Sequence, residues 1–140
     1  MVIRRMMKED NPSIYPALVL AYIGDAVYEV FTRKKLLLEH PDMPAHKLHV
    51  ENIKFVKAHA QSNSMAAIEP MLCEKELAVY KRGRNAKSAT VPKNANLADY
   101  RRATGFEALI GYLHLAGEED RLNEIMETAF KNAKIDIKQI

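Results

Sequence analysis

The chain has 140 residues, of which 28% are charged, and a formal net charge of +3 at pH 7. This length suits one domain, expected to span residues 1–140, that buries about two-thirds of the surface its unfolded chain exposes. The single cysteine, Cys73, excludes an internal disulfide and a cysteine-rich zinc site, which favours a reducing compartment. Asp25, Glu29 and Glu107 interrupt the apolar segments, so none reaches the roughly 20 residues of a membrane span. We therefore expect a cytoplasmic protein without a membrane segment.

Every long segment has helical rather than alternating periodicity, which predicts an all-α fold. A first helix is expected from about Pro16, a residue suited to a first turn, to about Glu39, before the proline-marked stretch 40–44. A second is expected over about 44–67, with any break near 62–64. The predicted inward residues of the first helix are Leu20, Ile23, Val27, Val30 or Phe31, and Leu37 or Leu38; those of the second are Leu48, Ile53, Val56 and Ala60.

A third, shorter helix is predicted from about Cys73 to Arg82. We expect it to stop at Gly83, because glycine readily adopts the left-handed conformation that follows a helix end. Residues 84–95 are polar, basic and marked by a proline, which predicts a loop.

The last two helices are indicated by their ends and by their apolar pattern. Asn96 and Asp99 form an N-cap pair that opens a helix reaching about Ala116, and Gly117 is expected to terminate it. A final amphipathic helix over about 118–133 carries its apolar residues on one face: Leu122, Ile125, Met126, Ala129 and Phe130.

Two acidic residues, Asp25 and Glu107, stand within segments that are otherwise apolar, and neither has an obvious local counter-charge. Small residues flank both, so the two helices are expected to approach closely and bring the acids together; these residues are Ala21, Gly24, Ala26, Gly105, Ala108 and Gly111. Two carboxylates in a partly dry site repel each other unless a cation or a proton lies between them. Magnesium commonly uses one or two protein carboxylates in this way. The alternative is that each acid is a tolerated polar residue on a half-exposed helix face.

Basic residues are concentrated in the segment 81–102, which holds seven Lys and Arg residues against the single acid Asp99. Such a segment is a candidate docking site for phosphate groups, whose contacts hold a duplex without reading its bases. The segment leads directly into the helix that bears Glu107, so its cations are expected near the acid pair. The alternative is an ordinary solvated run of charge.

These segments resemble a known family. Tyr22-Ile-Gly-Asp-Ala-Val-Tyr-Glu29 resembles the signature helix of the ribonuclease III family, Thr104-Gly-Phe-Glu-Ala-Leu-Ile-Gly-Tyr-Leu113 resembles its second acidic motif, and the likeness continues through 81–88. The resemblance is strongest to the compact bacterial branch that consists of the catalytic domain alone. It implies a ribonuclease III-like helical domain that forms a homodimer. It also implies cleavage of double-stranded RNA with Mg2+, for which Mn2+ can substitute, trimming of both ends of precursor 23S ribosomal RNA, and a ribosomal protein as a candidate partner.

By this resemblance, Asp25 and Glu107 match the family's catalytic, metal-binding acids. Two further acids of the larger enzymes have no match, because Ala21 and Thr104 occupy their positions. The same gaps are typical of the compact branch, so they do not exclude activity, but they argue against a tightly held second metal.

With no RNA-binding domain in this sequence, affinity for RNA is expected from the basic segment. The expected RNA contacts are Lys81, Arg82, Arg84, Asn85, Lys87, Ser88, Lys93, Arg101 and Arg102. Among them, Asn85 and Ser88 could reach sugar hydroxyls or base edges in the minor groove of an A-form duplex. Cutting both strands is simplest for a two-fold dimer, and the surplus apolar surface of the first helix suggests its interface: Leu18, Val19, Tyr22 and Ala26.

Two other functions compete with the endoribonuclease. One is a non-catalytic RNA-binding or ribosome-assembly module with the same fold, which the missing acids at Ala21 and Thr104 would suit. The other is a metal-dependent phosphohydrolase for small nucleotides, for which the sequence offers no base-enclosing motif. Retention of both Asp25 and Glu107 favours the enzyme.

Overall fold

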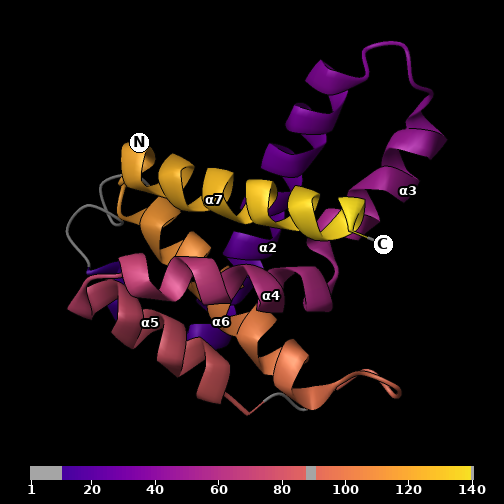
Figure 1. The fold of residues 1–140 in the computed structure, drawn as a ribbon. Coiled ribbons are helices and arrows are strands. Elements are labelled where there is room, and N and C mark those ends of the chain that lie inside the picture. The colour runs from indigo at the N-terminus through magenta and orange to yellow at the C-terminus, as the bar shows by residue number, and fades with distance from the viewer. Residues whose placement is uncertain (1–10, 88–90, 140) are drawn as a thin grey trace.

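A computed structural model describes residues 11–87 and 91–139, and over these it confirms an all-helical fold without strands (Figure 1). The α-helices are α2 (Ala17–Glu39), α3 (Ala45–Val56), α4 (Ala58–Ile68), α5 (Glu74–Asn85), α6 (Leu97–Leu115) and α7 (Glu119–Lys138). Two short 3-10 helices, η1 (Pro12–Ile14) and η2 (Glu69–Met71), accompany them. None of these helices has the length and apolar character needed to cross a membrane.

Helix α6 is the centre of the packing. It is buried on almost every side from Ala103 onward, and α2, α4, α5 and α7 all contact it. A helix that is apolar all round must be surrounded by protein. In Figure 1, α2 passes through this body, and its C-terminal part forms with α3 a hairpin that extends away from the other helices. The acid Glu107 is therefore carried by the most enclosed helix of the fold.

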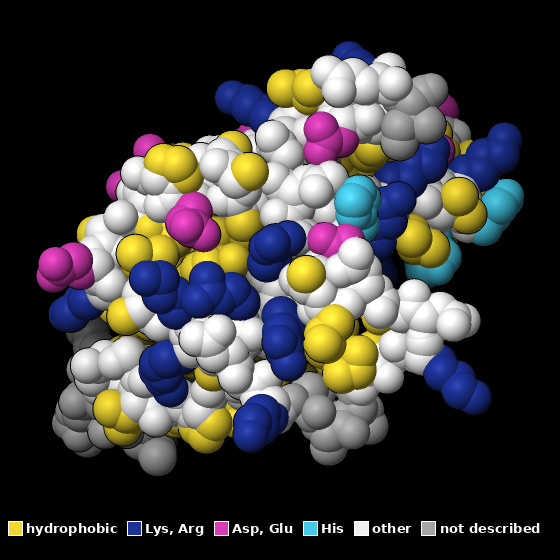
Figure 2. All heavy atoms as spheres, turned by 60° about the horizontal axis from the view of Figure 1, so that its bottom comes forward, with side chains coloured by type: hydrophobic (Ala, Val, Ile, Leu, Met, Phe, Trp, Pro, Cys, Tyr) yellow, Lys and Arg dark blue, Asp and Glu magenta, His cyan; other side chains and the backbone are white. Residues whose placement is uncertain are grey.

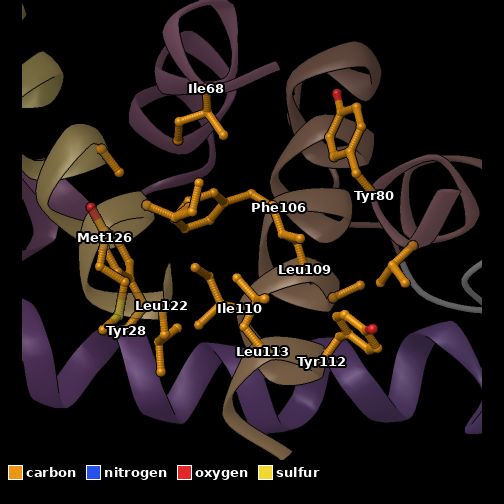
Figure 3. Close-up of a cluster of buried hydrophobic side chains, with 14 of the residues drawn as sticks. Tyr28, Ile68, Tyr80, Phe106, Leu109, Ile110, Tyr112, Leu113, Leu122 and Met126 are labelled. Atoms are coloured by element: carbon orange, nitrogen blue, oxygen red, sulfur yellow. The ribbon is translucent and has the colours of Figure 1, made fainter. Parts of the chain in front are cut away.

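The main core fixes α6 against its neighbours (Figure 3). Phe106, which is fully buried, meets Tyr28 of α2 edge to face with ring centroids 4.9 Å apart. Ile125 and Met126 of α7 close the same cluster, together with Leu122 and Ala129. The inward face predicted for the last helix is confirmed, although that helix continues to Lys138. The core thus locks the two acid-bearing helices, α2 and α6, to each other.

Residues 44–67 form two helices instead of the single one expected, and the break lies at Lys57 rather than near 62–64. Lys57 is extended, with φ −63° and ψ 154°. Phe55 and Ala60 both belong to a second buried cluster, in which Phe55 stacks on Phe130 of α7. In a continuous helix, positions five apart point about 140° away from each other, which does not suit two residues of one cluster. The tertiary packing of this cluster therefore accounts for the break.

Gly83 does not end the third helix, because α5 continues to Asn85. Gly83 is buried inside that helix, where a Cβ would lie 2.8 Å from both the Ala108 Cβ and the Gly105 Cα of α6. The glycine serves close helix packing instead of a left-handed turn. Gly117 does take the left-handed conformation, with φ 73°, and ends α6 as predicted.

Two of the predicted inward stripes were partly wrong. On α2 the buried apolar residue near the C-terminal end is Leu36, whereas Leu37 and Leu38 are 49% and 79% exposed. Phe31, not Val30, packs against the core. On α3 the inward residues are Asn52 and Phe55, and Ile53 is 46% exposed. Helix α2 is apolar on several faces, so periodicity alone could not choose the buried one.

Candidate active site

The acids are brought together by a direct contact between the backbones of α2 and α6. A Cβ on Gly24 would lie 1.7 Å from the carbonyl oxygen of Glu107, and one on Gly111 would lie 1.9 Å from the carbonyl oxygen of Leu20. No side chain fits at either position. The predicted close approach is therefore confirmed at Gly24 and Gly111, and it sets Glu107 beside the turn of α2 that carries Asp25.

The two carboxylates interact electrostatically. Glu107 is half-buried, while Asp25 is exposed, so only one of the two lies in the partly dry setting expected from the sequence. The pKa of Glu107 is raised to about 8. The largest cause is burial, followed by the charge of Asp25 and a hydrogen bond with it. The hydrogen bond from Gln61 acts in the opposite direction and lowers the pKa. Two carboxylates placed in this way therefore favour a shared proton or a shared cation over full ionisation of both.

This pair fits a small divalent ion that retains most of its water. Among the residues the structure describes, no three or more His, Cys, Asp or Glu side chains form a group that could hold a metal. Mg2+ needs no such cage, because it commonly binds one or two carboxylates and completes its coordination with water and substrate oxygens. At the positions of the missing acids, Ala21 is buried and the Thr104 hydroxyl donates to the carbonyl of Tyr100 at 3.0 Å. Asp25 and Glu107 are the side chains that would hold the ion.

Two contacts around the acids were missed in the sequence. Gln61 of α4 is buried, and its Nε2 lies 3.4 Å from Oε2 of Glu107. Glu29 follows Asp25 by one helical turn, and its Oε2 accepts hydrogen bonds from Asn52 Nδ2 at 2.8 Å and from Arg33 Nε at 2.9 Å. The available signal for Gln61 was its position within a run of small Ala and Ser residues, which favours close packing of the helix around a large polar side chain.

The basic segment lies on the face where α5 ends and α6 begins, and Figure 2 shows Lys and Arg side chains gathered on the side of the molecule that includes this region. Most of its predicted contact residues are exposed: Lys81, Arg82, Asn85, Lys87, Lys93, Arg101 and Arg102. Arg84 is half-buried, with its guanidinium 5.7 Å from the centre of the Tyr80 ring. Ser88 lies outside the described residues.

Several of these cations already have protein partners. The guanidinium of Arg82 donates to the backbone carbonyls of Ser13 and Tyr15, so it ties the start of the described chain to α5. Arg102 donates to the Ser62 hydroxyl at 3.4 Å. The acid of the segment, Asp99, pairs with His59 at 2.8 Å, and hydrogen bonds from His59 and Ser62 lower its pKa. Lys81, Lys87, Lys93 and Arg101 stand at the surface without such contacts in the structure described.

Comparisons with known proteins agree with this fold. The family model for the Ribonuclease III domain matches residues 18–118, a range that contains both acids. The chain therefore belongs to the ribonuclease III family. A Mini-ribonuclease 3 from Clostridium tetani is 53% identical over 120 residues, which cover 86% of this chain and 79% of that protein. One from Thermoanaerobacter sp. is 49% identical over 122 residues, 87% of this chain and 84% of that protein.

A solved structure supports the same placement. The crystal structure of a Fusobacterium nucleatum protein superposes with a TM-score of 0.75 at 30% sequence identity, covering 84% of this chain and 93% of that one. Within the ribonuclease III family, the chain groups with the Mini-ribonuclease 3 proteins. It is an endoribonuclease of the ribonuclease III type.

Proposed function

We propose that this protein is a cytoplasmic, magnesium-dependent endoribonuclease that hydrolyses double-stranded RNA and matures both ends of precursor 23S ribosomal RNA. The observation that carries the catalytic part is the meeting of Asp25 and Glu107 across the Gly24–Gly111 helix contact, where the charge of Asp25 helps to raise the pKa of Glu107. Kinship with the Mini-ribonuclease 3 proteins supports the RNA substrate.

Asp25 and Glu107 are the proposed ligands of Mg2+, and Mn2+ could take its place. The ion would activate a water molecule and stabilise the leaving oxygen of the phosphodiester. The protein supplies the fixed position of the two carboxylates, because α2 and α6 cannot slide past each other without a backbone clash. Exposure of Asp25 leaves the site open to a phosphate group of a duplex at the surface.

The exposed cations of the basic segment are the proposed phosphate contacts. Lys81, Lys87, Lys93, Arg101 and Arg102 line this surface, with Arg84 and Asn85 at the end of α5. Asn85 could reach the minor groove, where 2′-hydroxyls distinguish RNA from DNA. Arg82 contributes charge while its guanidinium holds Ser13 and Tyr15.

A homodimer is the proposed functional unit, since one acid pair per protomer would then cut one strand each. The N-terminal part of α2 offers an apolar surface for this contact: Leu18 is 40% exposed, Val19 45% and Tyr22 77%, and Ala26 is also exposed. Exposed apolar residues that cluster on one helix face are typical of interaction surfaces.

One alternative is favoured by a specific observation. Because Ala21 and Thr104 stand where larger relatives carry acids, the chain could be a non-catalytic RNA-binding or ribosome-assembly module. It would then bind duplex RNA through the basic segment without cutting it.

One assay separates the two functions. The wild type and Asp25→Asn are incubated with a perfectly paired RNA, with Mg2+, Mn2+ or EDTA. Metal-dependent cleavage by the wild type, with binding but no cleavage by Asp25→Asn, supports the enzyme. Binding without cleavage by both supports the module.

The natural substrate needs a second comparison. Transcripts carrying the paired ends of precursor 23S ribosomal RNA are compared with an unrelated duplex of equal length, each with and without ribosomal proteins. Equal cleavage of both transcripts under all conditions would contradict the proposed ribosomal substrate, while leaving the endoribonuclease intact.

A further inference from the structure

Gln61 is anchored by the break between α3 and α4. Its side chain is 2% exposed, and its Nε2 donates to the carbonyl oxygen of Val56 at 3.0 Å. Val56 is the last residue of α3, and the extended conformation of Lys57 ends the helix there. The last carbonyls of a helix lack intrahelical partners. The break therefore supplies the acceptor that holds this amide in place.

The orientation of the amide follows from that anchor. A backbone carbonyl only accepts hydrogen bonds, so the nitrogen of Gln61 must face Val56. The same nitrogen carries a second hydrogen, which it donates to Oε2 of Glu107 at 3.4 Å. Gln61 thus links the rigid helix break to the acid on α6.

The other end of the amide has no partner within the protein. Oε1 of Gln61 is one of two buried side-chain polar atoms, with Oδ1 of Asn52, that lack a hydrogen bond in the described structure. An unpaired buried acceptor costs about 1–3 kcal/mol. An apolar residue at this position would avoid the cost, so the presence of an amide indicates a role beyond packing.

Packing of α4 does not depend on this amide. Met65 and Ile68 are 2% and 0% exposed in the main core. Ser64 ties the helix to α7 by donating to the Ala129 carbonyl at 3.2 Å. The helix is therefore held without Gln61, and the position is free to serve the site.

We propose that Gln61 is a positioning residue for the metal site. Its N–H group, fixed by the Val56 carbonyl, holds the carboxylate of Glu107 in the orientation that lets Glu107 and Asp25 share one ion. This inference rests on the proposed function, because it requires a divalent ion at the acid pair. Residues that orient a metal ligand commonly change metal affinity by about 10–100-fold when replaced.

The test measures Mn2+ binding directly, by electron paramagnetic resonance of free Mn2+ with the full chain and no RNA. Gln61→Met keeps the size and removes the amide, whereas Gln61→Asn keeps an amide too short to reach both partners. Both are expected to bind Mn2+ about 10-fold or more weakly. The matched control is Ser64→Ala, which removes a buried hydrogen bond of the same helix away from the acids and should leave Mn2+ affinity unchanged.

Activity provides a second readout. Binding of duplex RNA in EDTA should be unaffected by Gln61→Met, while kcat falls and KM for RNA stays constant. If a Gln61 variant that retains a cooperative thermal transition binds Mn2+ like the wild type, the inference is overturned. An equal loss in Ser64→Ala would also overturn it, because the effect would then be general to α4.

Asp25→Asn distinguishes failure of this inference from failure of the proposed function. Loss of Mn2+ binding in Asp25→Asn but not in the Gln61 variants leaves the metal site standing and removes only the role of Gln61. Wild-type Mn2+ binding by Asp25→Asn would reject the acid pair as the metal site, and the inference with it.

Discussion

Gly24 of α2 and Gly111 of α6 lie against each other with no side chain between the two helix backbones. The amide nitrogen of Gly111 is 2.8 Å from where a Cβ of Gly24 would stand, and the nitrogen of Gly24 is 3.1 Å from the corresponding position of Gly111. Asp25 directly follows Gly24, so this backbone contact brings together the helix turns that carry the two acids.

Gly24→Ala should strongly destabilise the protein. Its new Cβ would stand 1.7 Å from the Glu107 carbonyl oxygen, so α2 and α6 would have to separate. Overpacking of this kind costs about 3 kcal/mol or more when the obstacle is backbone. Urea unfolding followed by circular dichroism measures the loss. Activity of any folded fraction should also fall, because the acids move apart.

Gly117→Ala is the matched control for that substitution. No atom lies within 4 Å of its Cβ position, but the residue has φ 73°. A left-handed alanine costs about 1–2 kcal/mol, so this variant should fold with a modest loss and cleave RNA normally. Equal stability losses in the two variants would contradict the importance of the α2–α6 contact.

Stability of the metal-free protein should fall as pH rises. Glu107 has its pKa raised from 4.5 to about 8 in the folded state, so the folded protein binds this proton more tightly than the unfolded chain does. The resulting stabilisation is complete below pH 4.5 and is lost as pH rises through about 8. Between these two pH values the free energy of unfolding falls by up to about 1.4 kcal/mol per pH unit. Urea unfolding in EDTA at pH 5.5, 7 and 8.5 measures it.

Glu107→Gln isolates this contribution, because a neutral amide cannot gain the charge. As pH rises, we expect the unfolding free energy of the wild type to fall relative to that of Glu107→Gln. Added Mn2+ should reverse that shift for the wild type alone, since an ion at the pair favours the ionised acid. A pH-independent difference between the two proteins would contradict the raised pKa of Glu107.

Neutralising Arg84 and Lys87 should weaken RNA binding and flatten its dependence on salt. Each phosphate contact that is lost reduces the slope of log K against log salt by roughly one. Gel-shift titrations of Arg84→Gln and Lys87→Gln at several KCl concentrations, in EDTA, measure both quantities. Lys131→Gln, which removes an exposed charge from α7, is the control. An unchanged slope in both variants would argue against the basic segment as the RNA surface.

Tyr22→Asp should convert the proposed dimer into a monomer. Tyr22 is 77% exposed in the apolar surface of α2, and a charge buried in a dimer contact is costly. Leu38→Asp places the same charge on a residue that is 79% exposed near the other end of the helix. Sedimentation velocity should show a dimer for the wild type and for Leu38→Asp. A wild type that sediments as a monomer while cutting both strands would rule out the two-fold arrangement.

Much of the fold could be predicted from local chemistry. Helical periodicity, the Asn96 side chain that accepts a hydrogen bond from the Asp99 amide, and the left-handed Gly117 define α6 and its ends. These signals are local, because caps and turns depend on residues a few positions apart. The same reasoning failed at Gly83, whose absent side chain accommodates Ala108 and Gly105 of another helix.

The candidate site divides in the same way. The sequence by itself determined which acids are unusual, since Asp25 and Glu107 interrupt apolar helical runs among small residues, and it determined where basic charge gathers. Only the tertiary structure decided the break at Lys57, the buried position of Gln61 beside Glu107, and the engagement of Arg82 with Ser13 and Tyr15. Those contacts join residues far apart in the chain, and their geometry arises from packing around α6, which no local pattern specifies.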